Sequence, residues 1–113
     1  MSAITTHVLD VSRGLPAAGV PVTLRRKDGD GWLELGSGTT DDDGRLRTLL
    51  PADQPLGAGT YLLRFDTGVY FAKDAVAGFY PEVTVAFTIR EPGGHYHVPL
   101  LLSPYGYSTY RGS

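Results

Sequence analysis

Cysteine is absent from the 113 residues of this chain. Its absence excludes disulfides, thiolate nucleophiles and every zinc or iron–sulfur site that needs a cysteine ligand. An excess of one charge is also missing, because 10 basic and 12 acidic residues leave a formal net charge of -2. No apolar run approaches the roughly 20 residues that a membrane-spanning helix needs. We therefore expect neither nucleic acid nor a membrane among the partners of this protein.

Several sequence signatures of common enzyme and targeting classes are missing as well. The N-terminal stretch MSAITTHVLD lacks the basic region followed by an apolar run that marks a signal peptide, so we expect a cytoplasmic protein. No serine lies in a G-x-S-x-G context, which argues against a serine-hydrolase triad. Neither a P-loop nor a dinucleotide-binding fingerprint is found.

Glycine and proline, in contrast, are abundant, with 15 and 8 residues, and this favours many turns and short strands. The clearest strand is 83–89, where apolar and polar residues alternate. Only 69–77 fits a helix, with two turns ended by Gly78. Further strands are predicted at 4–9, 20–24, 32–35, 60–65 and in the C-terminal segment. The pattern predicts a single domain, residues 1–113, folded as an antiparallel β-sandwich.

The C-terminal segment from His95 to Ser113 is the most unusual part of the chain. Its apolar strand at 98–102 leads through Ser-Pro-Tyr-Gly into a polar tail rich in tyrosine. Tyr105 and Tyr107 fall on one face at strand period. A chain end is normally frayed, so this regular pattern indicates an ordered strand that presents its side chains.

His95 and His97 are separated by one residue, so in a strand both point to the same side and Tyr96 points to the other. Two imidazoles at this spacing can share a metal ion. With no carboxylate or further histidine nearby in sequence, a partly exposed pair beside a turn is favoured, and we expect no metal site. A general base is the third possibility, since the ordinary pKa of imidazole is about 6.5.

Two residues from other parts of the chain could also carry chemistry. His7 lies within a predicted strand, where a lone histidine is more often structural than catalytic. Arg45 follows a turn and is either a solvated turn charge or a clamp for an anion or carbonyl group. The run Asp41–Asp43 resembles half of a calcium loop but lacks the later bidentate glutamate, so it predicts a turn. These residues alone do not identify a function.

Six stretches that together span nearly the whole chain resemble the transthyretin-related 5-hydroxyisourate hydrolases. They are THVLD (6–10), GLPAAGVPVTL (14–24), TDDDGR (40–45), GTYLLRFDTGVYF (59–71), FYPEV (79–83) and HYHVPLLLSPYGYSTYRGS (95–113). The closing YRGS is the motif that marks the enzymes of this family. In the hormone carrier transthyretin, the Leu-Leu-Ser-Pro-Tyr core is kept but this tetrapeptide and the histidine arrangement are lost.

The resemblance implies a transthyretin-like (prealbumin-like) sandwich of two four-stranded sheets with one short helix. It implies a homotetramer, a dimer of dimers, with active sites at the dimer–dimer interface. The implied reaction is the hydrolysis of 5-hydroxyisourate, the unstable product of urate oxidase, to 2-oxo-4-hydroxy-4-carboxy-5-ureidoimidazoline, without a cofactor. The apolar residues 100–102, together with Tyr105–Tyr107, would then line a subunit interface.

The resemblance also implies the residues of the site. The catalytic positions fall on His7, Arg45, His97 and Ser113. The substrate-binding positions fall on Arg45 and on the closing tetrapeptide, Tyr110, Arg111, Gly112 and Ser113. His95 matches the first histidine of the family's HYHVP segment. Two histidines of this kind can hold and deprotonate a water molecule, while an arginine binds the ring and stabilises an oxyanion.

Two other functions stay open on sequence grounds. One is a transthyretin-type binding module that carries a small aromatic ligand without chemistry. The set of His7, Arg45, His97 and the closing tetrapeptide argues against it. The other is a periplasmic or cell-surface sandwich used for adhesion, which the lack of a signal peptide disfavours.

Overall fold

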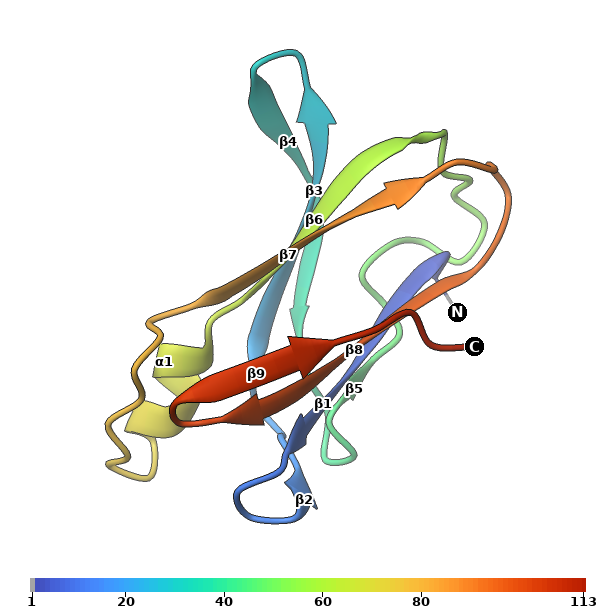
Figure 1. Ribbon diagram of the computed structural model, residues 1–113. Coiled ribbons are helices and arrows are strands. Elements are labelled where there is room, and N and C mark those ends of the chain that lie inside the picture. Colours follow the sequence, from blue (N-terminus) through green and yellow to red (C-terminus); the bar gives the residue numbers. More distant parts are fainter. Residues whose placement is uncertain (1) are drawn as a thin grey trace.

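The computed structural model describes residues 2–113 as two β-sheets packed face to face, with a short helix at one end (Figure 1). One sheet has the order β2-β1-β8-β9, with β5 also paired to β1, and the other has the order β4-β3-β6-β7. The elements are β1 (Ile4–Asp10), β2 (Leu15–Pro16), β3 (Pro21–Asp28), β4 (Gly31–Thr39), β5 (Arg45–Leu46), β6 (Gly59–Phe65), α1 (Thr67–Ala72), β7 (Val83–Ile89), β8 (Tyr96–Ser103) and β9 (Gly106–Thr109). The predicted all-β sandwich with one short helix is confirmed.

One strand pairing departs from the expected antiparallel arrangement. β1 runs parallel to β8, with Ile4 opposite Tyr96 and Asp10 opposite Leu102, whereas the other strand pairs are antiparallel. The first sheet also has five strands rather than four, because two two-residue strands, β2 and β5, pair with β1 along the edge opposite β8. A parallel pair needs a long crossover, and here the whole second sheet lies between β1 and β8 in the chain.

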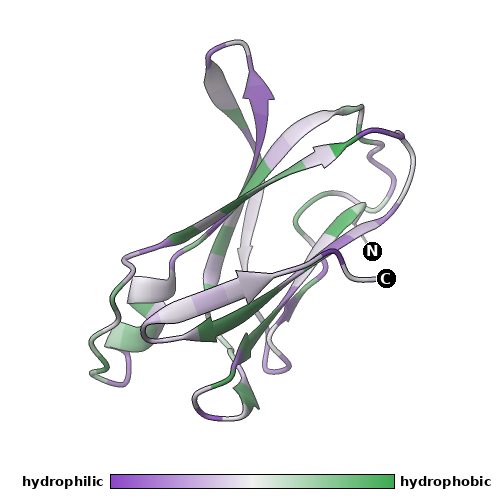
Figure 2. Cartoon of the chain, in the orientation of Figure 1, coloured by the Kyte–Doolittle hydropathy of each residue, from purple (hydrophilic) through white to green (hydrophobic). Residues whose placement is uncertain are grey.

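The hydrophobic core fills the space between the sheets, and the period-2 alternation of the strands places it there. Tyr61, Leu63 and Phe65 of β6 are fully buried, as predicted for one face of that strand. Val22 and Leu24 of the neighbouring β3 are buried as well. Hydrophobic bands follow the strands, while the tip of the β3–β4 hairpin is hydrophilic (Figure 2). Each large apolar side chain in this layer contributes about 1.5–3 kcal/mol by leaving water.

The interpretation of residues 100–102 as surplus apolar surface for an interface is wrong for two of the three. Leu100 and Leu102 are fully buried in the core, whereas Leu101 is half-buried. Because neighbouring residues of a strand point to opposite faces, only Leu101 points away from the core. An interface on that face would therefore use Leu101 alone from this stretch.

The helix is shorter than the predicted 69–77 and ends well before Gly78. Its C-terminus is defined by Ala75, whose φ of 56° is left-handed, and by the Val76 amide, which donates to the Phe71 carbonyl. This geometry is typical of a helix C-cap and is usually reserved for glycine. The prediction failed because an alanine adopts it here. Within residues 2–113, no helix has the length and hydrophobicity that crossing a membrane would require.

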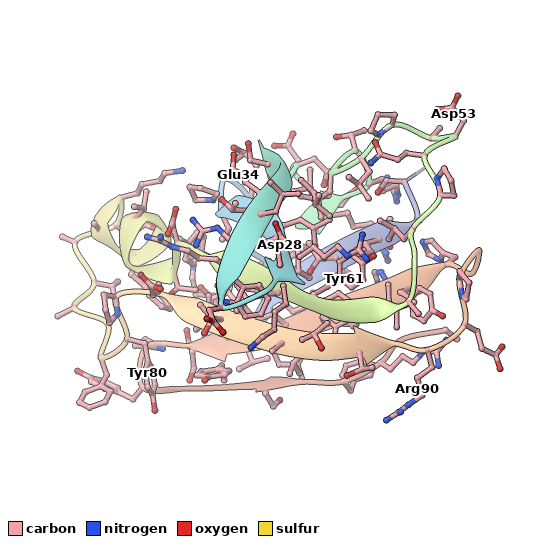
Figure 3. The ribbon with its side chains drawn as sticks, turned by 90° about the horizontal axis from the view of Figure 1, so that it is seen from above. Asp28, Glu34, Asp53, Tyr61, Tyr80 and Arg90 are labelled. Atoms are coloured by element: carbon pink, nitrogen blue, oxygen red, sulfur yellow. The ribbon has the colours of Figure 1, made fainter. Side chains whose placement is uncertain are left out.

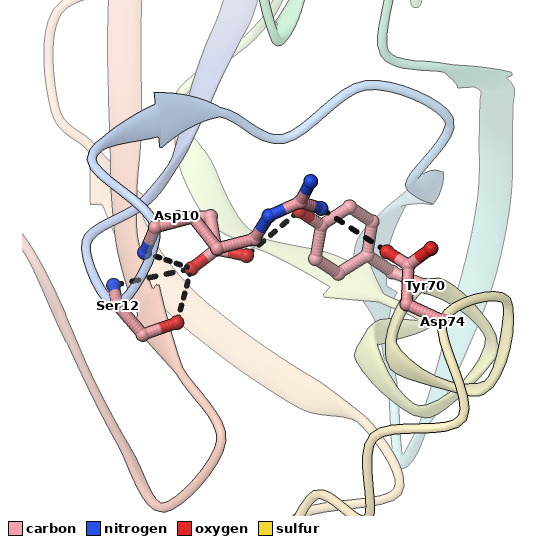
Figure 4. A network of polar contacts seen from close by, with 5 residues as sticks. Asp10, Ser12, Tyr70 and Asp74 are labelled. Atoms are coloured by element: carbon pink, nitrogen blue, oxygen red, sulfur yellow. Dashed lines mark hydrogen bonds and ion pairs between the residues drawn. The ribbon is translucent and has the colours of Figure 1, made fainter.

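A buried polar network joins the end of β1 to α1 (Figure 4). The Asp10 carboxylate accepts hydrogen bonds from the amide and hydroxyl of Ser12, from the Arg13 amide, and from the Tyr70 hydroxyl at 2.8 Å. Arg13 also forms an ion pair with Asp74 at 3.1 Å. A buried carboxylate is tolerated only when its oxygens are hydrogen-bonded, so this network ties the helix to the first sheet.

Replacing Tyr70 by phenylalanine is expected to lower the free energy of unfolding by about 1.5–3 kcal/mol, because a hydrogen bond to a buried charge is lost. Burial and the contact with Asp10 raise the pKa of Tyr70 to about 12 from 10.0. The folded state therefore holds the phenolic proton more tightly than the unfolded chain. This contribution is complete below pH 10 and is lost as the pH rises through 12.

Urea unfolding of the wild type and of Tyr70→Phe, below pH 10 and again near pH 12, measures this contribution. Tyr80→Phe, which removes the hydroxyl of a half-buried tyrosine outside the network, is the control. A stability difference for Tyr70→Phe that stays constant over this pH range would contradict the assignment.

The start of β1 and the C-terminal residues lie near each other, at the end of the molecule away from α1 (Figure 1). The β5–β6 loop, marked by Asp53, and the end of β7, marked by Arg90, reach the same end (Figure 3). The parallel pairing of β1 with β8 brings the starts of both strands there. The side chains that could take part in a reaction gather near this end.

Candidate active site

A cavity of about 250 Å³ lies where the first halves of β1 and β8 meet β5 and the C-terminal residues. Arg45, His97 and Ser113, which are far apart in sequence, all line it. The complete lining comprises Thr5, Thr6, Arg45, Arg47, His95, His97 and Ser113. We call this space the histidine–arginine cavity.

Strand β1 organises the cavity because it lies between β5 and β8. On one side, His7 is the register partner of Arg45 in the antiparallel β5. On the other side, Thr5 is the register partner of His97 in the parallel β8. Thr5 and His7 are two residues apart and so share one face of the strand. The sheet thereby brings together side chains from three segments of the chain.

The turn before Arg45 holds that residue against β1. The Asp41 carboxylate accepts hydrogen bonds from the amides of Asp43 at 2.9 Å and Arg45 at 3.0 Å, and the bond from the Arg45 backbone holds the pKa of Asp41 below its usual value. Gly44 has a φ of 74°, and a Cβ there would lie 2.3 Å from the Val8 carbonyl oxygen. Only glycine permits both this backbone conformation and this close approach. The aspartate run is a turn, as predicted.

His7 borders the cavity without being one of its lining residues. Its Nε2 lies 2.9 Å from the carbonyl oxygen of Asp43. A carbonyl oxygen can only accept a hydrogen bond, so Nε2 of His7 carries a proton. When the ring is neutral, Nδ1 is then the nitrogen with a free lone pair.

His97 is half-buried, and its Nδ1 lies 2.8 Å from the Thr5 hydroxyl oxygen. Burial lowers the pKa of His97 below 6.5, and the nearby charge of Arg45 and the rings of His7 and His95 lower it further. A hydrogen bond with the backbone of Thr5 acts in the opposite direction and is the weakest of these effects. His97 is therefore a neutral imidazole at neutral pH.

The C-terminal residues pass directly against His97. The Gly112 amide donates to the His97 carbonyl at 2.8 Å and forms an isolated bridge. A Cβ at Gly112 would lie 2.6 Å from Cδ2 of the imidazole. The lack of a side chain at this position lets the backbone pack on the ring and carry Ser113 to the cavity.

Tyr110 and Arg111 do not line this cavity. They face a groove of about 320 Å³ together with Tyr96 and Phe87, and the Arg111 guanidinium lies 4.8 Å from the centre of the Tyr96 ring. Tyr96 follows His95 and points to the other side of β8, as the spacing predicts. The closing tetrapeptide is thus divided, with Ser113 in the cavity and Tyr110 and Arg111 outside it.

No three histidine, aspartate or glutamate side chains within residues 2–113 gather closely enough to hold a metal ion. His95 and His97 instead converge on the hydroxyl of Thr5, at 3.2 and 2.8 Å. As predicted, the two rings point to the same side of the strand.

Three lining residues, Thr5, Thr6 and Arg47, received no role from the sequence. Thr5 could have been found, because it lies two residues before His7 in a predicted strand and so shares its face. Arg47 follows the end of the short strand β5, and no periodicity indicates where it points. In the structure its guanidinium lies 4.0 Å from the carboxylate of Asp41.

Comparison of the amino-acid sequence with known protein families identifies the family of this chain. The model of the HIUase/Transthyretin family matches residues 4–112. This chain belongs to that family. The 5-hydroxyisourate hydrolase of Salmonella typhimurium is 48% identical over 110 residues, which cover 97% of this chain and 80% of that protein.

Solved structures show the same transthyretin-like fold. The 5-hydroxyisourate hydrolase of Klebsiella pneumoniae aligns with a TM-score of 0.86 at 41% identity, over 100% of both chains. The transthyretin of Sparus aurata aligns with a TM-score of 0.90 at 32% identity, over 99% of this chain and 97% of the other. Because a hydrolase and a transthyretin share this fold, the backbone does not distinguish them. The side chains of the cavity have to do so.

Proposed function

We propose that this protein hydrolyses 5-hydroxyisourate to 2-oxo-4-hydroxy-4-carboxy-5-ureidoimidazoline in urate degradation. The observation that carries the proposal is the single cavity in which a neutral His97 lies with Arg45 and Ser113. The names of the Salmonella and mouse relatives, 48% and 47% identical over nearly the whole chain, support the same reaction.

The reaction begins with a water molecule held between His97 and His7. His97 accepts a proton from this water at Nε2, the ring nitrogen that does not face Thr5. His7 orients the water through its free Nδ1, since its Nε2 is bonded to the Asp43 carbonyl. The hydroxide then adds to the acyl carbon of the ring, the C–N bond breaks, and the leaving nitrogen takes the proton back from His97.

Arg45 supplies the positive charge that this sequence of steps requires. The substrate is planar and carries several carbonyl groups. The planar guanidinium can donate two parallel hydrogen bonds to such a ring. None of the ion pairs within residues 2–113 involves Arg45. Its charge is therefore available to bind the ring and to stabilise the oxyanion that forms when water adds. Ser113 and the adjoining backbone close the cavity beside His97.

The proposal includes assembly as a homotetramer, a dimer of dimers, with the sites at the dimer–dimer interface. Its support is the similarity to transthyretin structures and the open edges of the two sheets at β7 and β9. Tyr105, Tyr107 and Tyr110 lie on or next to β9 and are exposed. Light scattering tests the assembly, because a mass of one chain would contradict a site completed between dimers.

The pH dependence of turnover follows from the lowered pKa of His97. A general base must be neutral, so kcat/KM is expected to be constant around neutral pH and to fall only when the pH drops below 6.5. The rate of 5-hydroxyisourate decay, corrected for the spontaneous reaction at each pH, measures this profile. A decline that is already half complete above pH 6.5 would exclude His97 in this role.

Gly112→Ala tests the contact between the tail and His97. The added Cβ forces the ring or the tail to move, and a displacement of this kind is expected to lower kcat/KM by about 10- to 100-fold. Gly106→Ala in the same C-terminal hairpin is the control, since its Cβ would meet only Ser103 Oγ at an ordinary 3.6 Å. Equal activity of the two variants would mean that the tail does not position the imidazole.

The activity itself is tested on substrate generated in place. Urate is oxidised by urate oxidase, and the decay of the hydroxyisourate absorbance is followed with and without catalytic amounts of this protein. Faster decay, which is abolished by deleting residues 110–113, supports the hydrolase and its site together. Decay at the spontaneous rate would refute the proposal and favour a transthyretin-type carrier of a small aromatic ligand.

A further inference from the structure

The hydroxyl of Thr5 bridges the two histidines that begin the C-terminal segment. Its oxygen lies 2.8 Å from Nδ1 of His97 and 3.2 Å from Nε2 of His95. Thr5 is 3% exposed, so water does not replace these contacts easily. The parallel register of β1 and β8 places Thr5 directly beside His97.

A hydroxyl has one proton to donate and two lone pairs that accept. If Thr5 donates to His95, it can only accept from His97, so Nδ1 of His97 carries a proton and its Nε2 is free. If Thr5 donates to His97, the opposite tautomer of His97 results. One hydroxyl proton therefore couples the protonation states of the two rings.

We propose that Thr5 is a positioning residue that relays protons between His97 and His95. The inference rests on the proposed hydrolysis, in which His97 is both base and acid. In the resting state, His97 donates from Nδ1 to Thr5, and Thr5 donates to Nε2 of His95. This arrangement leaves Nε2 of His97 free to take a proton from water.

The relay step is balanced in protons. When Nε2 of His97 takes the proton of water, the Nδ1 proton passes to the Thr5 oxygen, and the hydroxyl proton of Thr5 passes to Nε2 of His95. His97 is then neutral with its proton on Nε2, and His95 is the cation. The reverse movement occurs when Nε2 of His97 gives its proton to the leaving nitrogen of the substrate.

Electrostatics give the relay its direction. The surroundings of His97 disfavour a positive charge, because the ring is half-buried and faces Arg45 from β5 and His7 from β1. Arg47 brings a second positively charged side chain to the same cavity. His95 is exposed, so water can solvate its cation. Moving the charge from His97 to His95 through Thr5 thus stabilises the state that forms after the water is deprotonated.

Two variants of Thr5 separate the hydroxyl from the shape of the side chain. Thr5→Val keeps the branched shape without the hydroxyl and is expected to lower kcat by about 10- to 100-fold with little change in KM. Thr5→Ser keeps the hydroxyl and is expected to retain most of the wild-type kcat. Thr67→Val is the matched control, because Thr67 is equally buried and its hydroxyl bonds the Tyr80 carbonyl outside the cavity.

Long-range ¹H–¹⁵N correlation spectra of the histidine rings give a readout that does not depend on activity. In the wild type and Thr67→Val, the proton of neutral His97 is expected on Nδ1. In Thr5→Val, the Nδ1 proton should no longer be favoured. Thr5→Ser should preserve the wild-type tautomer.

The proposal is overturned if Thr5→Val keeps the wild-type kcat and ring spectra, or if Thr5→Ser is as impaired as Thr5→Val. If Thr5→Val does not fold, the wild-type spectra decide, because a proton on Nε2 of neutral His97 would refute the relay. Failure of the wild type to accelerate substrate decay would refute the proposed function instead. The ring spectra distinguish these two failures.

Discussion

His97→Asn is expected to lower kcat by about 10²- to 10⁴-fold, the usual contribution of a general acid–base group. Asparagine keeps a polar side chain near the Thr5 hydroxyl but has no nitrogen that can accept a proton from water. The residual activity of the variant should be nearly independent of pH, because the group that titrates in the wild type is gone. Decay of freshly generated 5-hydroxyisourate at saturating concentration is the measurement.

The control for His97→Asn is Tyr96→Phe, which changes the neighbouring residue on the other face of β8. The Tyr96 hydroxyl donates to the Glu91 carbonyl and not to a group of the cavity. Both variants should unfold at similar temperatures, so that a loss confined to His97→Asn reflects chemistry. Full turnover by His97→Asn would remove His97 from the mechanism.

Arg45→Gln is expected to lower kcat/KM by about 10²- to 10³-fold, the range found when a group that stabilises an oxyanion is removed. The effect should appear in kcat as well as in KM, because the charge is needed most when water has added to the carbonyl carbon. Arg45→Lys should recover only part of the activity, since an ammonium group lacks the planar pair of donors.

Arg64→Gln controls for the loss of a positive charge alone. Arg64 lies in β6 of the other sheet and pairs with Asp66 and Glu82 on the surface, at 3.1 and 3.2 Å. Such exposed ion pairs contribute about 0–1 kcal/mol to the stability of the folded state, so this variant should retain both fold and activity. Equal losses in Arg45→Gln and Arg64→Gln would indicate a general effect of net charge rather than a contact with substrate.

Local regularities made most strands predictable. In β6, the alternation of Tyr61, Leu63 and Phe65 gave the correct face because the side-chain period of a strand is two. The turn before β4 was predictable from its Asp-Gly repeat, which lies between β3 and β4 as expected. The helix boundary was not, because Ala75 adopts a left-handed conformation that its sequence does not indicate.

The composition of the candidate site could be derived only in part. The spacing of His95 and His97 correctly indicated that they face the same way. It did not indicate that both rings contact Thr5, a residue from the opposite end of the chain. The division of the closing tetrapeptide, with Arg111 stacked on Tyr96 outside the cavity, was equally hidden.

The sequence by itself determined the strands, the turns and the residues that are able to carry chemistry. These features depend on neighbours within a few positions, where alternation and turn propensity act directly. Only the tertiary structure decided that β1 pairs in parallel with β8 and that His97 lies between Thr5 and Gly112. The direction and register of strands distant in sequence are set by packing and long-range hydrogen bonding. The lowered pKa of His97 arises from the same packing, because burial and the charge of Arg45 exist only once the sheet has formed.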